Sequence, residues 1–189
     1  MDYGTPKQLT DGRYYLKTIK DGQRVFVQLK DVRIMTKFNS EENVTLSIPE
    51  TAQYKIMDID SQNIDAAKAN SQEWFGREVP EKTIEAAYTK SLSDGIMNVG
   101  KATVNKNVMT KIYNSDRTMY NSELLEENTE CNVILEFSGL VFMKKTFSPI
   151  WRVAQIMLKK APKSKYPEEC MFENEVESEI ESDNDDDYI

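Results

Sequence analysis

Residues 24–38 read RVFVQLKDVRIMTKF and carry the strongest strand signal in the chain. β-Branched and aromatic residues, which pack well on a pleated sheet, recur along it. Directly before this stretch, Asp21-Gly22 predicts a two-residue hairpin turn, which joins it to a strand over residues 14–19. After it, residues 44–48 alternate up to Pro49 and predict a third strand, and we expect a fourth over residues 53–59.

The period of the apolar residues changes after residue 60. Residues 61–75 place apolar side chains at helical spacing, and Pro80 precedes a second helical stretch over residues 81–88. We therefore expect a helical insert over about residues 61–93, with Trp74 and Phe75 as core anchors.

The rest of the body again favours strands. Residues 101–113 alternate, which predicts one strand with Ala102, Val104, Val108 and Ile112 on its buried face. Two further strands are expected over residues 131–147 and 150–158, separated at Ser148-Pro149 and preceded by a polar loop. Several strands, a helical insert and then several strands fit a five-stranded OB-type barrel, and so a mainly β fold with a helical insertion. A β-sandwich or another small barrel fits the strand count nearly as well.

The charge of the chain is divided between two parts. The 189 residues include 24 Lys and Arg and 32 Asp and Glu, a net charge of −8. Residues 166–189 contain eleven acidic residues and no basic one, so residues 1–165 carry a net charge of +3. We predict a folded, mildly basic domain over residues 1–165 and a disordered acidic tail over residues 166–189.

Several classes of chemistry lack the residues they need. The chain has no histidine and only two cysteines, Cys131 and Cys170, which removes His-based catalysis and Cys- or His-rich zinc sites. The stretch GIMNVGKA at residues 95–102 approaches a phosphate-binding loop, but Ala102 stands where Ser or Thr is required. We interpret Asp58 and Asp60 as a solvated strand end. The sequence thus predicts a protein that is not an enzyme and has no cofactor or metal.

Aromatic residues interleaved with Lys and Arg are the most informative feature of the body. A groove for single-stranded nucleic acid needs both kinds, because cations follow the phosphates and aromatic faces stack on the bases. From charge and alternation we predict the following groove residues: Arg33, Lys37, Lys101, Lys106, Lys111, Tyr113, Lys144, Lys145, Trp151 and Arg152.

The whole arrangement resembles a known viral family. A strand-rich basic body with a helical insert, followed by an acidic segment that finishes Asp185-Asp186-Asp187-Tyr188-Ile189, resembles the virus-encoded single-stranded DNA-binding proteins of the phage gene 2.5 protein type. The stretch NSQEWFG at residues 70–76 is similar to the branch found in large nucleo-cytoplasmic DNA viruses.

The resemblance implies an OB fold and sequence-independent binding of single-stranded DNA, often as a homodimer. It further implies a role in viral DNA replication, recombination and repair. The tail residues Asp185, Asp186, Asp187, Tyr188 and Ile189 would recruit replication proteins (polymerase, helicase or primase) and compete with DNA.

The chain shows neither a signal peptide nor an apolar run long enough to span a membrane. We expect an intracellular, non-secreted protein in the host cytoplasm or nucleus, at sites of viral DNA replication. Two alternatives stay open. One is a non-enzymatic viral structural or assembly module whose acidic tail binds basic proteins, and the other is a small nucleotide-handling enzyme that uses residues 95–102.

Overall fold

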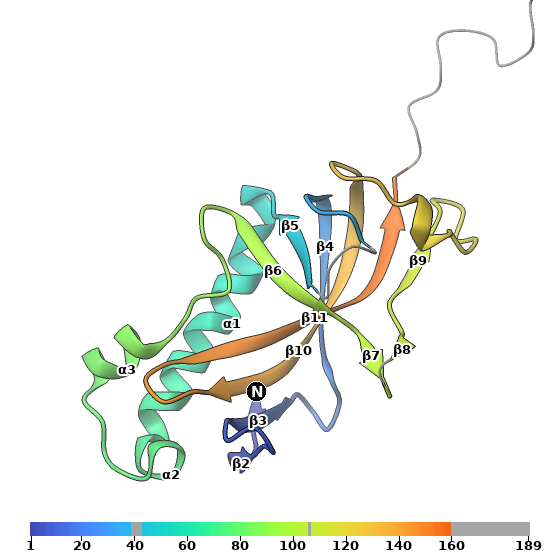
Figure 1. Cartoon of the computed structure of the whole chain (residues 1–189). Helices are drawn as coiled ribbons and strands as arrows, with labels where there is room; N and C mark the ends of the chain where they lie inside the picture. The colour runs from blue at the N-terminus through green and yellow to red at the C-terminus, as the bar shows by residue number, and fades with distance from the viewer. Residues whose placement is uncertain (39–42, 106, 160–189) are drawn as a thin grey trace, which may run out of the picture.

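Five strands close into a ring in the computed structural model, which describes residues 1–38, 43–105 and 107–159 (Figure 1). The ring strands are β4 (Val25–Ile34), β5 (Asn43–Ser47), β6 (Ile96–Lys101), β10 (Glu130–Phe142) and β11 (Phe147–Leu158). Around the ring, β4 pairs with β5, β5 with β6, β6 with β11, β11 with β10, and β10 with β4. Only β6 and β11 pair in parallel within this ring. The predicted OB-type barrel is confirmed.

Alternation along the ring strands fills the barrel. Leu29, Val44, Met97, Leu135 and Val153 are each at most 1% exposed and come from five different strands. Because side chains on a strand point alternately to the two faces, the neighbours of these residues face outward. Because the ring is closed, each of its five strands has a neighbouring strand on both sides over the paired part of its length.

Three helices connect β5 to β6 and cover the barrel from one side (Figure 1). They are α1 (Glu50–Ala69), α2 (Ser71–Phe75) and α3 (Glu81–Ala87). The expected strand over residues 53–59 is therefore wrong, since these residues lie in the first half of α1. The buried residues Ala52, Ile56, Ile59, Asn63 and Ala67 follow each other at intervals of three or four, which is a helical period. The insert begins at Glu50, just after Pro49, and its last helix ends at Ala87.

Short strands extend the barrel at both ends. β1 (Asp2–Tyr3) and β2 (Lys7–Gln8) pair with β3 (Tyr14–Ile19), and β3 pairs with the end of β10. β9 (Lys111–Tyr113) adds to β11 in parallel, and a 3₁₀ turn (Ser122–Leu124) follows it. Lys20 and Gln23 pair across Asp21 and Gly22, both of which have positive φ, so the predicted hairpin turn is confirmed.

Residues 101–113 do not form the single strand that their alternation predicts. The chain leaves the barrel after Lys101 and folds into a hairpin of β7 (Thr103–Val104) and β8 (Asn107–Val108) before β9 begins. Val104 and Val108, expected in the core, are 57% and 51% exposed. The Thr110 hydroxyl donates to the carbonyl of Val153 and accepts the N–H of Ala102, which closes the base of the hairpin.

The last two strands meet at a different place from the predicted one. β10 ends at Phe142, a turn follows over residues 143–146, and Pro149 lies inside β11, opposite Leu140. Among the described residues, β10 is the only strand beside β11 at Pro149, because β6 pairs with β11 further along at Arg152 and Val153. Proline is tolerated at such an edge, because no ladder partner requires its missing N–H. Within the part of the chain that is described, every helix is too short or too polar to cross a bilayer.

Candidate nucleic-acid interface

The outward side chains of four adjacent strands form one continuous surface, which we call the outer face. The strand register aligns them in three rows. The first row is Phe26, Glu136 and Arg152; the second is Gln28, Ile134, Gln155 and Lys111; the third is Asn132, Met157 and Tyr113. Since all three rows use the same parity on β10, they lie on the same side of the sheet.

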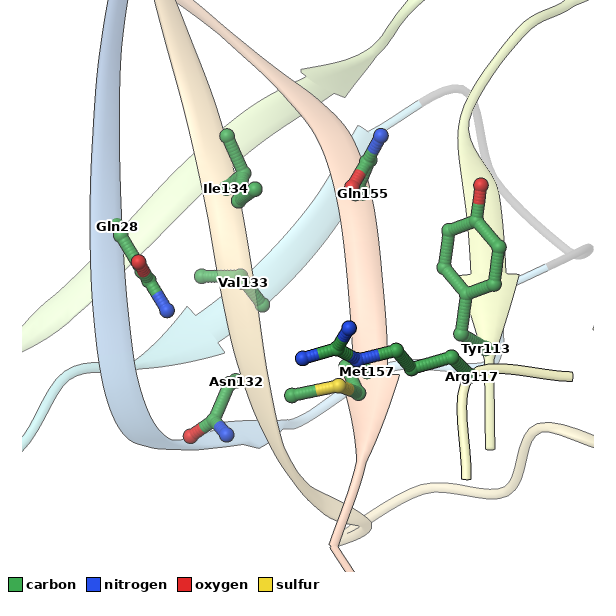
Figure 2. Close-up of a pocket in the computed structure, with 8 residues that line it drawn as sticks. All are labelled: Gln28, Tyr113, Arg117, Asn132, Val133, Ile134, Gln155 and Met157. Atoms are coloured by element: carbon green, nitrogen blue, oxygen red, sulfur yellow. The ribbon is translucent and has the colours of Figure 1, made fainter. Parts of the chain in front are cut away.

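The outer face carries amide side chains in its second and third rows and an aromatic residue on each of its two outermost strands, β4 and β9. Phe26 is 54% exposed, an unusual position for a large aromatic residue on a central strand. Tyr113 lines a hollow of about 250 Å³, together with Gln28, Gln155, Met157 and Arg117 (Figure 2). Pockets that bury a small molecule typically measure about 300–1,000 Å³, so this hollow fits part of an extended ligand better than an enclosed one.

Cations gather at one end of the outer face. Lys17, Arg24 and Arg152 line one hollow with Tyr15 and Glu136, and Val104 and Met109 of the β7–β8 region form its other side. An Arg24 nitrogen lies 3.4 Å from a carboxylate oxygen of Glu136. Burial raises the pKa of the Tyr15 phenol, and the nearby Arg152 charge partly opposes that shift. Three cations around one carboxylate leave this end of the surface positive.

A second group of cations lies near Tyr113. Lys111 is exposed on β9, and the Arg117 side chain extends over β11 beside Met157 (Figure 2). Within residues 1–38, 43–105 and 107–159, none of the following forms an ion pair: Lys17, Lys111, Arg117 and Arg152. Their charge is therefore available to an anionic ligand.

Three of the ten predicted groove residues lie on the outer face: Lys111, Tyr113 and Arg152. The prediction of Trp151 as a stacking residue is wrong, because this side chain is 5% exposed. Its ring packs at 5.2 Å from that of Phe137 inside the barrel. Alternation explains the difference, since Arg152 points outward and its neighbour Trp151 must point inward.

Trp151 belongs to a buried polar network that joins the insert to the barrel. Its Nε1–H donates to the Ser91 hydroxyl at 2.8 Å, and that hydroxyl donates to Asp60 at 2.6 Å. The Tyr88 hydroxyl also donates to Asp60, at 2.7 Å, while Asn63 donates to Tyr88. Asp60 is thus a buried acceptor on α1, and its interpretation as a solvated strand end is wrong.

Arg33 lies opposite Glu130, one row beyond Asn132 on the same side of the sheet, whereas Lys37 and Lys101 lie outside the rows. Arg33 donates to Glu130 at 2.9 Å, and this contact, with a second one from Lys159, lowers the pKa of Glu130. Lys101 holds its amine 4.6 Å from the ring centre of Phe38. Lys37 is exposed in the segment that follows β4.

Two predicted cations lie at the other end of the β10–β11 hairpin, and some predicted residues are not described. Lys144 and Lys145 are exposed in the turn between β10 and β11, beside α2 and α3. Lys106 and the tail residues Asp185, Asp186, Asp187, Tyr188 and Ile189 lie outside the described residues.

The ten predicted groove residues do not include four contributors to this surface: Lys17, Arg24, Phe26 and Arg117. Phe26 was counted with the apolar residues of the 24–38 stretch. The alternation of that stretch contains the missing signal, because Phe26 lies between the inward residues Val25 and Val27.

An OB-type barrel with a cationic and aromatic outer face is thus the class of molecule that the structure defines. The profile of the family of unknown function DUF5871 matches residues 26–174, and the chain belongs to that family. No curated protein gives a significant match.

The solved structures similar to this chain include three of the single-stranded DNA-binding protein from bacteriophage Enc34. The complex with single-stranded DNA is 12% identical, with a TM-score of 0.47, and the match covers 86% of this chain and 98% of that one. A C-terminal truncation is 12% identical, with a TM-score of 0.49 and coverage of 79% and 96%. A third structure of that protein is 13% identical, with a TM-score of 0.49 and coverage of 91% and 94%.

Proposed function

We propose that the protein binds single-stranded DNA, independently of sequence, along the outer face. The observation that carries this proposal is the exposed ring of Phe26 in the same set of rows as Tyr113 and cations without ion pairs. Aromatic faces stack on any base, and cations attract the phosphates. The amides of Gln28, Gln155 and Asn132 add hydrogen bonds that adapt to different base edges.

The dimensions of the outer face suit a polymer. From Asn132 to Glu136 the three rows advance four residues along β10, a length of about 13 Å. OB-type domains that bind single strands occupy about 4–16 nucleotides each. An open surface of this kind holds a strand without positioning a group for bond cleavage, and we propose a binding protein that is not an enzyme.

The division of charge supports a role for the tail. We propose that the segment over residues 166–189, with its eleven acidic residues, competes with DNA for the basic body and recruits replication proteins such as a polymerase, helicase or primase. In this proposal the protein acts in viral DNA replication, recombination and repair, as a homodimer, in the host cytoplasm or nucleus.

Substitution of the two aromatic residues tests the proposal directly. We expect Phe26→Ala and Tyr113→Ala each to weaken binding of a fluorescent mixed-sequence oligonucleotide, measured by anisotropy. Loss of one stacked base is worth about 1–3 kcal/mol, or roughly 5- to 160-fold in affinity. Different oligonucleotide sequences should lose affinity alike.

Leu124→Ala is the matched control, because Leu124 is an exposed apolar residue away from the outer-face rows. It should leave the affinity unchanged. Wild-type affinity in both aromatic variants would remove the outer face from the proposal. No binding of single strands by the intact chain would instead favour an assembly module whose tail binds basic proteins.

A further inference from the structure

A second hollow, which we call the aromatic pocket, lies at the end of the β10–β11 hairpin, away from the outer-face rows. It measures about 670 Å³ and is walled by α2 and the turn after it, by α3, by the turn over residues 143–146, and by residues near the N-terminus. In Figure 1 the turn over residues 143–146 lies beside α2 and α3, where β11 begins. This volume falls within the range of pockets that bury a ligand.

Aromatic rings form the floor of the aromatic pocket. Phe142 and Phe147 stack with their centres 5.4 Å apart and their planes 7° from parallel. Phe75 presents an edge contact to both rings, and Trp74 makes an edge contact with Phe142. Ring faces are therefore occupied by other rings, and the floor offers apolar walls instead of free stacking surfaces.

The rim of the aromatic pocket combines exposed apolar groups with cations. Tyr14 and Met143 are 44% and 47% exposed. Arg77, Lys144 and Lys145 also line the pocket, against the single acid Glu73. Arg77, Lys144 and Lys145 form no ion pair with any residue that the structure describes. The rim thus fits a ligand that carries apolar side chains next to negative charges.

One segment of this chain has that chemistry. Residues 185–189 read Asp-Asp-Asp-Tyr-Ile, three acids followed by two apolar residues. We infer that this segment docks in the aromatic pocket of its own chain, with Tyr188 and Ile189 against the aromatic floor and the three aspartates facing Arg77, Lys144 and Lys145. This inference does not rest on DNA binding.

The length of the connecting chain permits such docking. The last described residue, Lys159, follows the end of β11, and the aromatic pocket lies near its beginning at Phe147. β11 is about 37 Å long at the usual rise per residue. The chain from residue 159 to 185 reaches about 80 Å when extended, so it spans this distance with slack.

Single-stranded nucleic acid is the other ligand with negative charges and flat apolar groups. The aromatic pocket suits it less well, because Phe142 and Phe147 are 7% and 1% exposed and already stack on each other. A base needs an exposed ring face, as Phe26 provides on the outer face. Aliphatic and phenolic side chains need only apolar walls.

Photocrosslinking in the full chain tests the inference. A photoreactive benzoylphenylalanine in place of Tyr188 should crosslink to Tyr14, Met143 or residues 142–147 of the same chain, as mapped by mass spectrometry. Lys144→Glu combined with Lys145→Glu should lower the crosslink yield about fivefold, since two exposed ion pairs are lost and the charges are reversed. Lys20→Glu combined with Lys30→Glu makes the same charge change on exposed residues elsewhere and should leave the yield unchanged. Circular dichroism checks that each variant is folded.

Four results would overturn the inference. Crosslinks that map to the outer face, or a yield unchanged by reversal at Lys144 and Lys145, would remove the aromatic pocket as the docking site. A covalent dimer would show that the pocket receives the segment of a second copy. Finally, if single-stranded DNA protects Lys144 and Lys145 from amine labelling when Tyr188 and Ile189 are both replaced by Ala, the pocket belongs to the nucleic acid. The labelling result and the anisotropy of the Phe26 variant are independent, so failure here is distinct from failure of DNA binding.

Discussion

Two neighbouring residues, Trp151 and Arg152, show how one position along a strand separates stability from binding. The Trp151 indole lies in the barrel and donates to Ser91, which in turn holds the buried Asp60. The Arg152 guanidinium lies among the cations of the outer face. Removal of the Trp151 side chain should therefore affect stability, whereas removal of the Arg152 side chain should affect binding.

We expect Trp151→Phe to lower the free energy of unfolding by about 1–3 kcal/mol, because it removes one buried hydrogen bond and some packed volume. It should leave the affinity for single strands unchanged. Arg152→Ala should weaken binding and change the free energy of unfolding by about 0.5 kcal/mol or less, as is usual for surface substitutions. Urea unfolding and anisotropy on both variants measure this reversal, and equal effects of the two substitutions would contradict it.

At the scale of elements, β10 organises the molecule. It pairs with β4 and β11 in the barrel, and its far end pairs with β3. Gly139 makes the pairing of β10 with β3 possible. A Cβ at this position would lie 1.9 Å from the carbonyl oxygen of Leu16, and the φ of Gly139 is +143°. β3 brings Lys17 to the outer face and Tyr14 to the aromatic pocket, so this contact serves both surfaces.

Gly139→Ala should lower the free energy of unfolding by at least about 2 kcal/mol, through backbone strain and the clash with β3. Gly12→Ala is the matched control, since Gly12 also has positive φ but nothing lies within 4 Å of its added Cβ. The difference between the two variants in urea unfolding isolates the strand contact. Equal losses of stability would show that conformational strain alone is responsible.

At the scale of the whole molecule, the sign of the charge depends on which residues are counted. The net charge of −8 divides into +3 over residues 1–165 and −11 over residues 166–189. A protein whose net negative charge were spread evenly over its surface would repel DNA. Residues 1–165 alone carry a net positive charge and attract it.

Deletion of residues 166–189 should therefore raise the affinity for single strands at low salt. The difference in affinity between the deleted and the full-length chain should become smaller as the salt concentration increases. A full-length chain with all eleven Asp and Glu residues of 166–189 changed to Asn and Gln should behave like the deletion. A chain in which only Tyr188 and Ile189 are replaced by Ala keeps the charge and separates anchoring from repulsion. An affinity unchanged by the deletion at low salt would remove the competing-tail proposal.

Local signals in the sequence predicted the parts of the fold that local physics determines. The Asp21-Gly22 turn, the strand that follows it and the helix after Pro80 are confirmed. The strand expected over residues 53–59 is wrong because seven residues are too few to establish a period, and Ile56 and Ile59, three apart, share a face only in a helix. The whole of α1 shows the helical period.

The site was harder to predict, because the orientation of a strand residue depends on distant pairing. On β11 the register shifts by one residue: Leu135 faces Val153, whereas Ile134 faces Gln155. Ala154 is the extra residue of this bulge, and it keeps both Arg152 and Gln155 on the outer face. No pattern in residues 150–158 alone reveals a bulge, and plain alternation from Arg152 would place Gln155 inside the barrel. Lys111 and Tyr113 depend on β9, whose partner β11 lies more than forty positions along the chain.

The ring of strands has a consequence for the order of folding. β4 begins at Val25, but one of its two ring neighbours, β10, begins only at Glu130. Likewise, β6 can pair with β11 only after that strand has been synthesised. Pairings between distant segments form slowly, because the entropy of closing a long loop is lost before the contacts are gained. During synthesis β4, β5 and β6 therefore emerge as a sheet with two open edges, and the barrel closes only when the last hairpin leaves the ribosome. Until the barrel closes, these edges are the part of the nascent chain most exposed to aggregation. Protection by chaperones matters most during this time.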